Sequence, residues 1–324
     1  MVVWGSLYLL LAGVVVFLSI KLADYVDLID KKTNISGAFI GGVVLAAVTS
    51  LPELFTSISA VTIVNQPNMV LGNILGSNLF NVTIIGFLIM FMTKKFLHST
   101  VGKSHLKSAL FTLVLFGLMF FAVYLGFDFS VLNISIYSIV IIGIYAISVR
   151  FMAGDDASEE SKDTSKLSLK AIIILFVLTA VFLVFASIGI TYVTDKLAAE
   201  LNLGATLAGA LFLGIATSLP ELTSCMALAK KGNFNACMGN VLGSGLFNFL
   251  ILAISDLIYR GGSMYKGDSQ SKTLVLFCLI SMALVITTLV KKFSQKKENN
   301  ANNIVYKILG IGIIICYVLF IVLS

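Results

Sequence analysis

The chain has 324 residues, of which 58% are hydrophobic and only 12% are charged, and its mean hydropathy is +1.02. This composition excludes a soluble globular domain and is typical of a protein that lies in a membrane. The net charge of +6 reflects membrane topology, because most basic residues fall in loops on one side. Anionic lipid headgroups are the natural partner of this charge, and nothing in the sequence indicates binding to nucleic acid.

A helix that crosses the hydrocarbon core needs about 20 largely apolar residues. Runs such as "AIIILFVLTAVFLVFASIGI" are apolar on all sides, and no strongly alternating strand pattern occurs, which favours a helical bundle over a β-barrel. The first run lacks a preceding basic stretch and a clear cleavage site, so we expect a retained helix. We predict ten spans, near residues 2–23, 37–63, 69–92, 108–126, 130–152, 169–194, 205–229, 236–259, 273–290 and 304–323.

The basic residues predict the orientation, because loops on the cytoplasmic side carry an excess of Lys and Arg. If the N-terminus lies outside, 18 of the 22 basic residues fall on the cytoplasmic side. Lys196, Arg260, Lys266 and Lys272 remain on the other side. We therefore predict a multi-pass protein of the plasma membrane with both termini outside. The cytoplasmic set is Lys21, Lys31, Lys32, Lys94, Lys95, Lys103, Lys107, Arg150, Lys162, Lys166, Lys170, Lys230, Lys231, Lys291, Lys292, Lys296, Lys297 and Lys307.

The two halves of the chain repeat. "TSLPEL" occurs at 49–54 and again at 217–222, and "GNILGSNLFN" at 72–81 matches "GNVLGSGLFN" at 239–248. We predict a first five-helix repeat at 1–152, a polar cytoplasmic linker at 153–168, and a second five-helix repeat at 169–324. Five is an odd number, so the second repeat enters the membrane from the opposite side. The predicted fold is an all-α membrane protein of two inverted repeats with broken helices at the centre, a plan of secondary transporters.

Each repeat places a proline and an acid in an apolar span. Pro52 and Pro220 lack a backbone donor and disturb the carbonyl four residues earlier, which frees polar groups inside the membrane. Glu53 and Glu221 add negative charge, and the cores of the four helices concerned contain no Lys or Arg. An intramembrane acid is a functional candidate, so we predict a cation site, with a buried structural pair as the alternative.

Hydroxyl and amide side chains accompany both acids and would complete an oxygen-rich set of the kind that Ca²⁺ prefers. No His or Cys stands in register in both copies, which argues against zinc, copper or iron. The serines could instead serve close helix packing, together with the glycines at 72, 76, 239 and 243. The candidate side chains are Thr49, Ser50, Ser77 and Asn81 in the first repeat and Thr217, Ser218, Ser244 and Asn248 in the second.

The doubled motifs resemble the two alpha-repeats of the cation/calcium antiporter superfamily, and above all those of its sodium/calcium exchanger branch. The resemblance implies that Glu53 and Glu221 are central ligands shared by Ca²⁺ and Na⁺, joined by carbonyls near Thr49 and Thr217. It also implies an amide or acid position filled by Asn81. The remaining implied groups are the Na⁺ ligands Ser50, Ser77, Ser218 and Ser244, the carbonyls of Ala46 and Gly214, and Asn248 as the partner of Asn81.

Two positions depart from that pattern. Gly245 stands where the first repeat has Asn78, and Asn248 stands where many exchangers have aspartate. The second change leaves the site with a charge of about −2. Because the proton/calcium branch typically shows a different glutamate-centred signature, H⁺ is the alternative coupling ion.

The sequence thus predicts a Na⁺/Ca²⁺ antiporter that exports Ca²⁺ by alternating access. The resemblance implies that the first helix of each half, 2–23 and 169–194, slides across a rigid core. Ca²⁺ and Na⁺ are transported ions, and no resident cofactor, protein partner or enzymatic activity is predicted, since phosphate-loop and nucleophile motifs are absent. A proton/calcium antiporter, a cation channel and, least of all, an intramembrane enzyme remain open.

We also make predictions for cysteines and aspartates that lie outside the proposed ligand set. The four cysteines at 225, 237, 278 and 316 lack the spacing of a zinc site or a disulfide framework, so we expect apolar packing. Cys225 lies one turn beyond Glu221 on the same helix face, so it would line an ion passage if that face does, with a packed apolar residue as the alternative. Asp24, Asp27 and Asp256 are expected at helix ends near the membrane interface.

Overall fold

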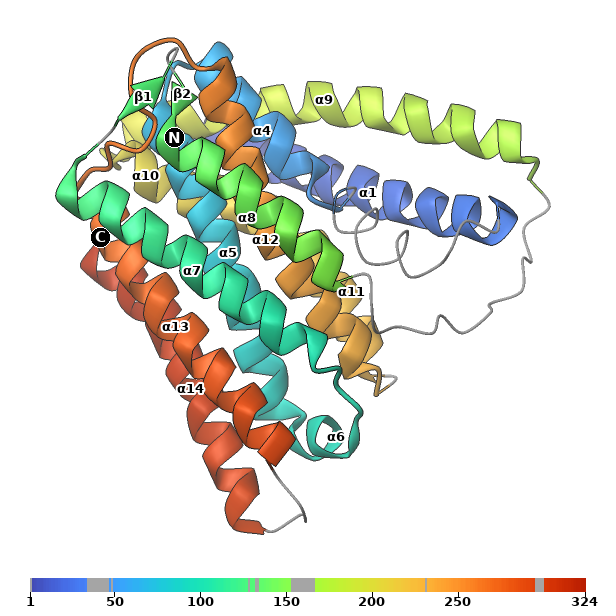
Figure 1. Ribbon diagram of the computed structural model, residues 1–324. Helices are drawn as coiled ribbons and strands as arrows, with labels where there is room; N and C mark the ends of the chain where they lie inside the picture. Colours follow the sequence, from blue (N-terminus) through green and yellow to red (C-terminus); the bar gives the residue numbers. More distant parts are fainter. Residues whose placement is uncertain are drawn as a thin grey trace.

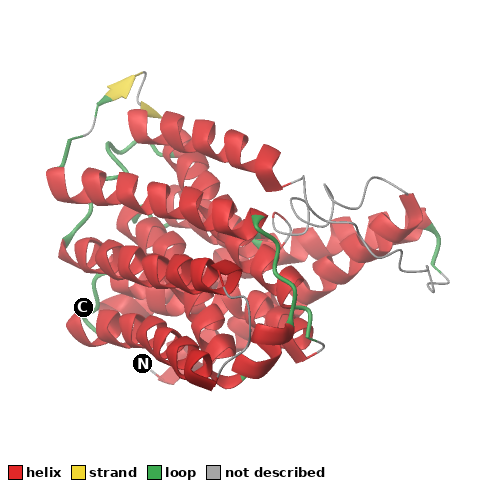
Figure 2. Ribbon diagram, turned by 60° about the horizontal axis from the view of Figure 1, so that its bottom comes forward, coloured by secondary structure: helices red, strands yellow, loops and turns green. Residues whose placement is uncertain are grey.

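The computed structural model describes residues 2–33, 47, 49–127, 129–131, 134–152, 167–230, 232–294 and 300–324, and these are almost wholly helical (Figures 1 and 2). The helices of the first half are α1 (Val2–Thr33), α4 (Leu51–Thr62), α5 (Pro67–Phe91), α6 (Thr93–His98), α7 (Ser104–Leu125) and α8 (Ile136–Met152). Those of the second half are α9 (Leu169–Glu200), α10 (Ala205–Ala208), the π-helix η2 (Gly209–Leu213), α11 (Gly214–Lys230), α12 (Phe234–Ile258), α13 (Ser269–Ser294) and α14 (Asn300–Leu323). Strands β1 (Ser130–Val131) and β2 (Ile134–Ser135) form a short hairpin.

The predicted all-α membrane fold is confirmed. Among the described residues, eight helical segments are long and apolar enough to cross a membrane, and α8 is a shorter apolar helix. The predicted span at 37–63 is described as a helix from α4 onward, and residues 34–46 and most of the predicted linker, 153–166, lie outside the described residues. Helix α1 runs ten residues beyond its predicted end, and α6 and the hairpin were not predicted because both are short.

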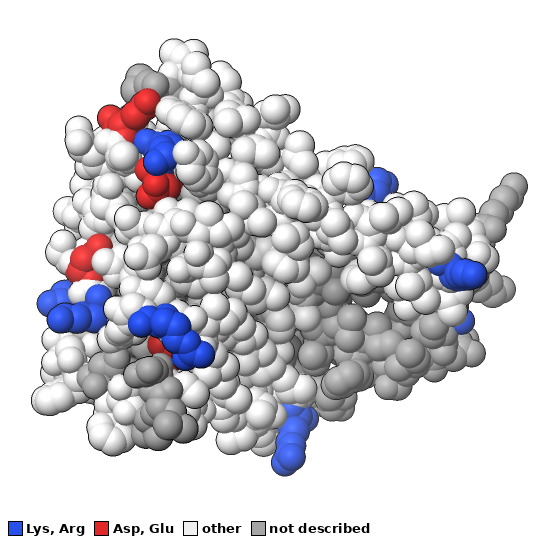
Figure 3. Space-filling model, turned by 90° about the horizontal axis from the view of Figure 1, so that it is seen from above, with Lys and Arg blue, Asp and Glu red and all other residues white. Residues whose placement is uncertain are grey.

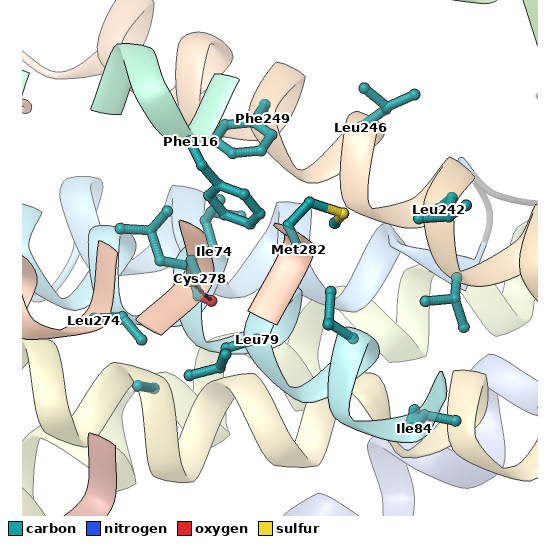
Figure 4. Close-up of a cluster of buried hydrophobic side chains, with 14 of the residues drawn as sticks. Ile74, Leu79, Ile84, Phe116, Leu242, Leu246, Phe249, Leu274, Cys278 and Met282 are labelled. Carbon is teal, nitrogen blue, oxygen red and sulfur yellow. Dashed lines mark hydrogen bonds between the residues drawn. The ribbon is translucent and has the colours of Figure 1, made fainter. Parts of the chain in front are cut away.

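The core of the bundle lies around α5 and α12, which are the most enclosed of the long helices. Figure 4 shows part of it, where apolar side chains of α5, α7, α12 and α13 meet. The rings of Phe116 and Phe249 pack edge to face with centroids 5.2 Å apart, and Ile74 and Met282 lie beside them (Figure 4). Burial of these large side chains holds the two central helices in fixed positions.

The helix pairing follows the sequence repeat. Helix α5 packs against α13 and α14 of the second half, and α12 packs against α7 and α8 of the first half. Helices α1 and α9 lie side by side at the edge of the bundle (Figure 1). They are antiparallel, because Trp4 contacts Tyr192 while Leu11 lies beside Gly189, and this is the relation that inverted repeats require.

Hydrogen bonds near the helix ends show which segments lie on the same face of the bundle. At one end, Lys95 Nζ donates to the carbonyl of Lys230, and Lys292 Nζ donates to the carbonyl of Phe96. These predicted cytoplasmic segments therefore share a face. At the other end, Gln270 Nε2 donates to the carbonyl of Ser324. Seen from above, charged side chains are few and most of the surface is uncharged (Figure 3); which face lies outside stays a prediction.

Asp256 lies near the end of α12, as expected, but its side chain is buried, with only 2% of it exposed. Its Oδ2 accepts hydrogen bonds from Ser135 N at 3.0 Å and Ser138 Oγ at 2.6 Å. The same Ser138 hydroxyl lies 2.6 Å from the hydroxyl of Tyr265. Asp256 thus joins the end of α12 to the hairpin and the start of α8. Asp24, by contrast, is exposed and forms an ion pair with Lys21, as an interfacial residue would.

Glycines let α5 approach the segment from α10 to α11. A Cβ at Gly72 would overlap the carbonyl oxygen of Thr206, and one at Gly76 would lie 2.5 Å from the Cα of Ala210. On the opposite helix, a Cβ at Gly214 would lie 2.9 Å from the backbone nitrogen of Ser77. Small residues of this kind bring helix backbones close together in membranes.

We expect Gly76→Ala to destabilise the protein, because the new methyl group meets backbone that cannot move away. Overpacking of this kind costs about 1–3 kcal/mol, and thermal unfolding in detergent, followed by circular dichroism, should show a lower midpoint. Gly117→Ala on α7 is the matched control, since a Cβ there meets nothing within 4 Å. Equal midpoints for the two variants would contradict the close approach of the helices.

Candidate functional site

The two predicted acids lie at the centre of the bundle, and both have 0% of their surface exposed. Glu53 is in the first turn of α4, where Pro52 occupies a position that needs no N–H donor. Glu221 lies in α11, which continues through Pro220. The irregularity in the second repeat precedes that proline, as the π-helix η2, and short π segments often occur at functional sites.

Side chains from opposite repeats meet at each acid. Glu53 Oε1 accepts a hydrogen bond from Ser218 Oγ at 3.2 Å, so an acid of the first repeat contacts a hydroxyl of the second. Glu221 Oε1 accepts one from Ser244 Oγ at 3.4 Å, and this hydroxyl also lies 3.4 Å from Thr49 Oγ1 of the first repeat. Both carboxylates are therefore linked across the boundary between the repeats.

Two contacts of the site are equivalent under the repeat. Ser77 and Thr217 hydroxyls lie 3.4 Å apart, which is the same separation as that between Ser244 and Thr49. Ser77 corresponds to Ser244, and Thr217 corresponds to Thr49, in the aligned motifs. Ser77 Oγ also donates to the carbonyl of Gly214 at 3.3 Å. The site thus has two similar halves, each built from a serine of one repeat and a threonine of the other.

The asparagines break this symmetry. Asn78 Nδ2 donates to the carbonyl of Gly245 at 3.3 Å, and Asn78 Oδ1 accepts from Asn248 Nδ2 at 3.0 Å. Asn78 and Gly245 are equivalent positions, so the two-fold relation passes between them, and a cavity of about 10 Å³ beside them leaves room for one water at most. Gly245 has no side chain to receive the equivalent bond from Asn81, whose amide atoms both lack a partner among the described residues.

Several buried polar atoms of the site have no hydrogen-bond partner among the described residues, as expected of groups that bind a cation. An unpaired polar atom is costly in an apolar environment, and the unpaired oxygens here are the type that a hard cation binds. Within the described part of the chain, buried atoms of the site without a hydrogen bond are Ser50 Oγ, Glu53 Oε2, Asn81 Oδ1 and Nδ2, Glu221 Oε2 and Asn248 Oδ1.

The charge of the site is not balanced by a basic side chain. The ion pairs found between described residues join Lys21 with Asp24 and Lys196 with Asp195, away from the two glutamates. Two ionised carboxylates that are buried together need a cation or protons, because desolvation and mutual repulsion both oppose their charge. No cluster of three or more His, Cys, Asp or Glu occurs in the described ranges, so a cation bound here would take most of its ligands from hydroxyl, amide and carbonyl oxygens.

All ten predicted side chains are buried, on α4, α5, α11 and α12 or just before α4. The contacts above join the two acids, both threonines and three of the serines with the carbonyl of Gly214, whereas the side chains of Ser50 and Asn81 have no hydrogen bond to another described residue. The carbonyl of Ala46 lies outside the described residues. Asn78 was missed as a bridging residue, although it lies inside the doubled motif, because a position that differs between the copies carries no repeat signal.

Comparison with known proteins gives matches along nearly the whole chain. The family model described as sodium/calcium exchanger protein matches residues 2–154 and again 171–324. An uncharacterized membrane protein of Methanocaldococcus jannaschii is 27% identical over 222 residues, which are 67% of this chain and 69% of that protein. The two separate family matches agree with an internal repeat.

Two solved structures share the fold. A crystal structure of the H⁺/Ca²⁺ exchanger CAX has a TM-score of 0.73 at 15% identity, over 99% of this chain and 86% of that chain. The sodium-calcium exchanger NCX_Mj, soaked with Na⁺ and Sr²⁺, has a TM-score of 0.62 at 24% identity, over 99% of both chains. Structural similarity and sequence identity thus rank these two exchangers in opposite orders.

Replacing either acid should weaken Ca²⁺ binding while the protein stays folded. Glu53→Gln and Glu221→Gln each remove half of the negative charge of the site, and we expect binding at least about 100-fold weaker, since loss of one buried charge partner costs roughly 3–5 kcal/mol. Equilibrium ⁴⁵Ca²⁺ binding to purified protein measures the effect. Asp24→Asn, at an exposed position, should bind as the unmodified protein does. Unchanged binding by Glu221→Gln protein would overturn a shared site.

Proposed function

We propose that this chain, which belongs to the sodium/calcium exchanger protein family, is a secondary antiporter that exchanges Na⁺ for Ca²⁺ by alternating access. It is an integral membrane protein, and we place it in the plasma membrane with both termini outside, exporting Ca²⁺. The proposal needs no resident cofactor, protein partner or enzymatic step, because Ca²⁺ and Na⁺ are cargo. Its relatives with named activities are exchangers, not enzymes.

One observation carries the proposal: two fully buried glutamates, each hydrogen-bonded to a serine and surrounded by unpaired oxygens. We propose that both carboxylates bind Ca²⁺ or Na⁺ at the centre, and that Thr49 and Thr217 supply carbonyls to Ca²⁺. A hydroxyl or amide oxygen binds Na⁺ without a charge of its own, so several Na⁺ ions can replace one Ca²⁺ on overlapping oxygens. The proposed flanking Na⁺ ligands are Ser50, Ser77, Ser218, Ser244, Asn81, Asn248 and the carbonyls of Ala46 and Gly214.

The same residues support Na⁺ as the coupling ion. With amides at both Asn81 and Asn248, the site has only two acidic side chains, and both are needed to balance one Ca²⁺. A third carboxyl that could carry a transported proton is absent from the described site, which favours Na⁺. H⁺/Ca²⁺ exchange is the alternative function, and the similarity of the fold to that of CAX supports it.

For the movement we propose that α1 and α9 slide across the remaining helices. They pack on each other at the edge of the bundle, and large apolar side chains on their outer faces are exposed, as contact with lipid requires. One polar contact ties α1 to the site helices. Tyr8 OH donates to the carbonyl of Phe212 in η2 at 2.7 Å, next to Gly214. The sliding helix is thus in contact with the segment that precedes the ligands.

Vesicle flux tests the function directly. In reconstituted vesicles, we expect an outward Na⁺ gradient to drive ⁴⁵Ca²⁺ uptake, and an outward proton gradient to drive little. Glu53→Gln vesicles are the control for leak. Uptake with protons alone would favour the H⁺/Ca²⁺ alternative, and uptake that needs no opposing gradient would favour a channel. Absence of uptake under every gradient would contradict a Ca²⁺ transporter.

Asn248→Asp should add pH dependence to transport. Asn248 now donates to Asn78 Oδ1, which an ionised aspartate cannot do, whereas a protonated carboxyl can. We therefore expect the variant to take up a proton with the ion cycle and to show a stronger change of ⁴⁵Ca²⁺ flux between pH 6 and 8. Asn81→Asp is the matched comparison, because the amide of Asn81 donates no hydrogen bond to a described residue, so an aspartate there does not need to be protonated to replace it. Identical pH profiles for both variants would contradict this account.

A further inference from the structure

Asn73 lies outside the proposed ligand set and is fully buried in α5. Its Nδ2 donates to Thr56 Oγ1 at 3.0 Å and to Ser57 Oγ at 2.9 Å, both on α4. The Thr56 hydroxyl lies 2.8 Å from the carbonyl of Pro52 and 3.1 Å from that of Glu53, and it can donate to either. Asn73 Nδ2 also donates to the Glu53 carbonyl directly, at 3.4 Å. One amide of α5 thus reaches the backbone of the acid on α4, both directly and through a hydroxyl.

The second repeat contains the same arrangement. Asn240 of α12 donates from Nδ2 to Ser224 Oγ at 2.9 Å on α11, and Ser224 Oγ donates to the carbonyl of Glu221 at 3.0 Å. Asn240 corresponds to Asn73, and Ser224 corresponds to Thr56, in the aligned motifs. Two independent copies of one hydrogen-bonded relay are difficult to explain as incidental packing.

We infer that Asn73 and Asn240 are positioning residues that fix each glutamate against the ligands on the following helix. Asn73 lies four residues before Ser77, and Asn240 lies four residues before Ser244, so each amide stands one turn from a proposed Na⁺ ligand on the same helix face. Locking this amide to the glutamate helix sets the separation of carboxylate and hydroxyl. This inference rests on the proposed function, since it concerns the geometry of the transported ion.

The two relays differ in strength. The second acceptor of Asn73 is the Ser57 hydroxyl, whereas the equivalent acceptor of Asn240 is the Cys225 thiol, at 3.7 Å. A thiol sulfur is a weak acceptor, so α11 is held less firmly to α12 than α4 is to α5. Cys225 is fully buried and its thiol donates to the carbonyl of Cys237 at 3.6 Å, so it takes part in this contact and does not line an open passage.

The test compares half-saturating Ca²⁺ and maximal rate in Na⁺-driven ⁴⁵Ca²⁺ uptake. Loss of one net hydrogen bond corresponds to about tenfold, and we expect Asn73→Ala to raise half-saturating Ca²⁺ by that factor. Asn73→Ala combined with Ser57→Ala should be no worse than Asn73→Ala alone, because both changes remove one interaction. Asn68→Ala, on the same helix and with no side-chain hydrogen bond to the described residues, is the control.

Cys225→Ser is an independent test, which can be made even if Asn73→Ala protein does not fold. A serine hydroxyl accepts the hydrogen bond from Asn240 better than the thiol does, so the change should lower half-saturating Ca²⁺ about threefold in the unmodified protein. It should have no effect in Asn240→Ala protein, where the donor is missing. An effect of the same size in both backgrounds, or Asn73→Ala behaving as Asn68→Ala, would overturn the positioning role. Failure of the unmodified protein to take up Ca²⁺ would instead overturn the proposed function, so the two failures are distinct.

Discussion

Two carboxylates buried in one membrane bundle are the constraint on which the rest of this structure depends. Glu53 and Glu221 have no exposed surface, and the ion pairs between described residues do not include them. Because the membrane interior opposes isolated charge, the pair is tolerated only with cations or protons close by. A cation between the acids could also bind the hydroxyl oxygens around them. The surrounding helices would then have to hold those oxygens close to the two carboxylates.

That requirement explains the glycines. Ser77 on α5 reaches Thr217 and the carbonyl of Gly214 only because Gly214 and Gly76 let the two backbones approach closely. A side chain at either glycine would push the serine away from its partners. These glycines, which the sequence alone could assign to packing, thus also determine the distance between the proposed ligands. The packing and binding interpretations of the motif therefore concern the same close contact.

The fold could be predicted, because apolar runs report membrane spans, and the doubled motif indicated which polar side chains lie buried at the centre of the bundle. What depended on tertiary contact could not be predicted. Asp256 lies near the end of an apolar helix, as predicted, but its burial and its hydrogen bonds to Ser135 and Ser138 depend on residues far away in the sequence. The π-helix η2 precedes Pro220, and no local residue in "GALFL" marks it. The ligand roles themselves, and the carbonyl of Ala46, stay predictions.

The repeat also explains why the two halves of the site cannot be identical. Residues that face each other across a two-fold relation share one space, and at Asn78 and Gly245 only one side chain is present. Asn78 uses its amide on Gly245 and Asn248, so Asn248 keeps only its oxygen for an ion. Asn81 lacks the equivalent neighbour, so no such hydrogen bond to a described residue fixes its amide. Because of this single glycine, an ion in one half would meet an amide oxygen that is held in place by Asn78, whereas an ion in the other half would meet one that is not, although the motifs that form those halves are nearly the same.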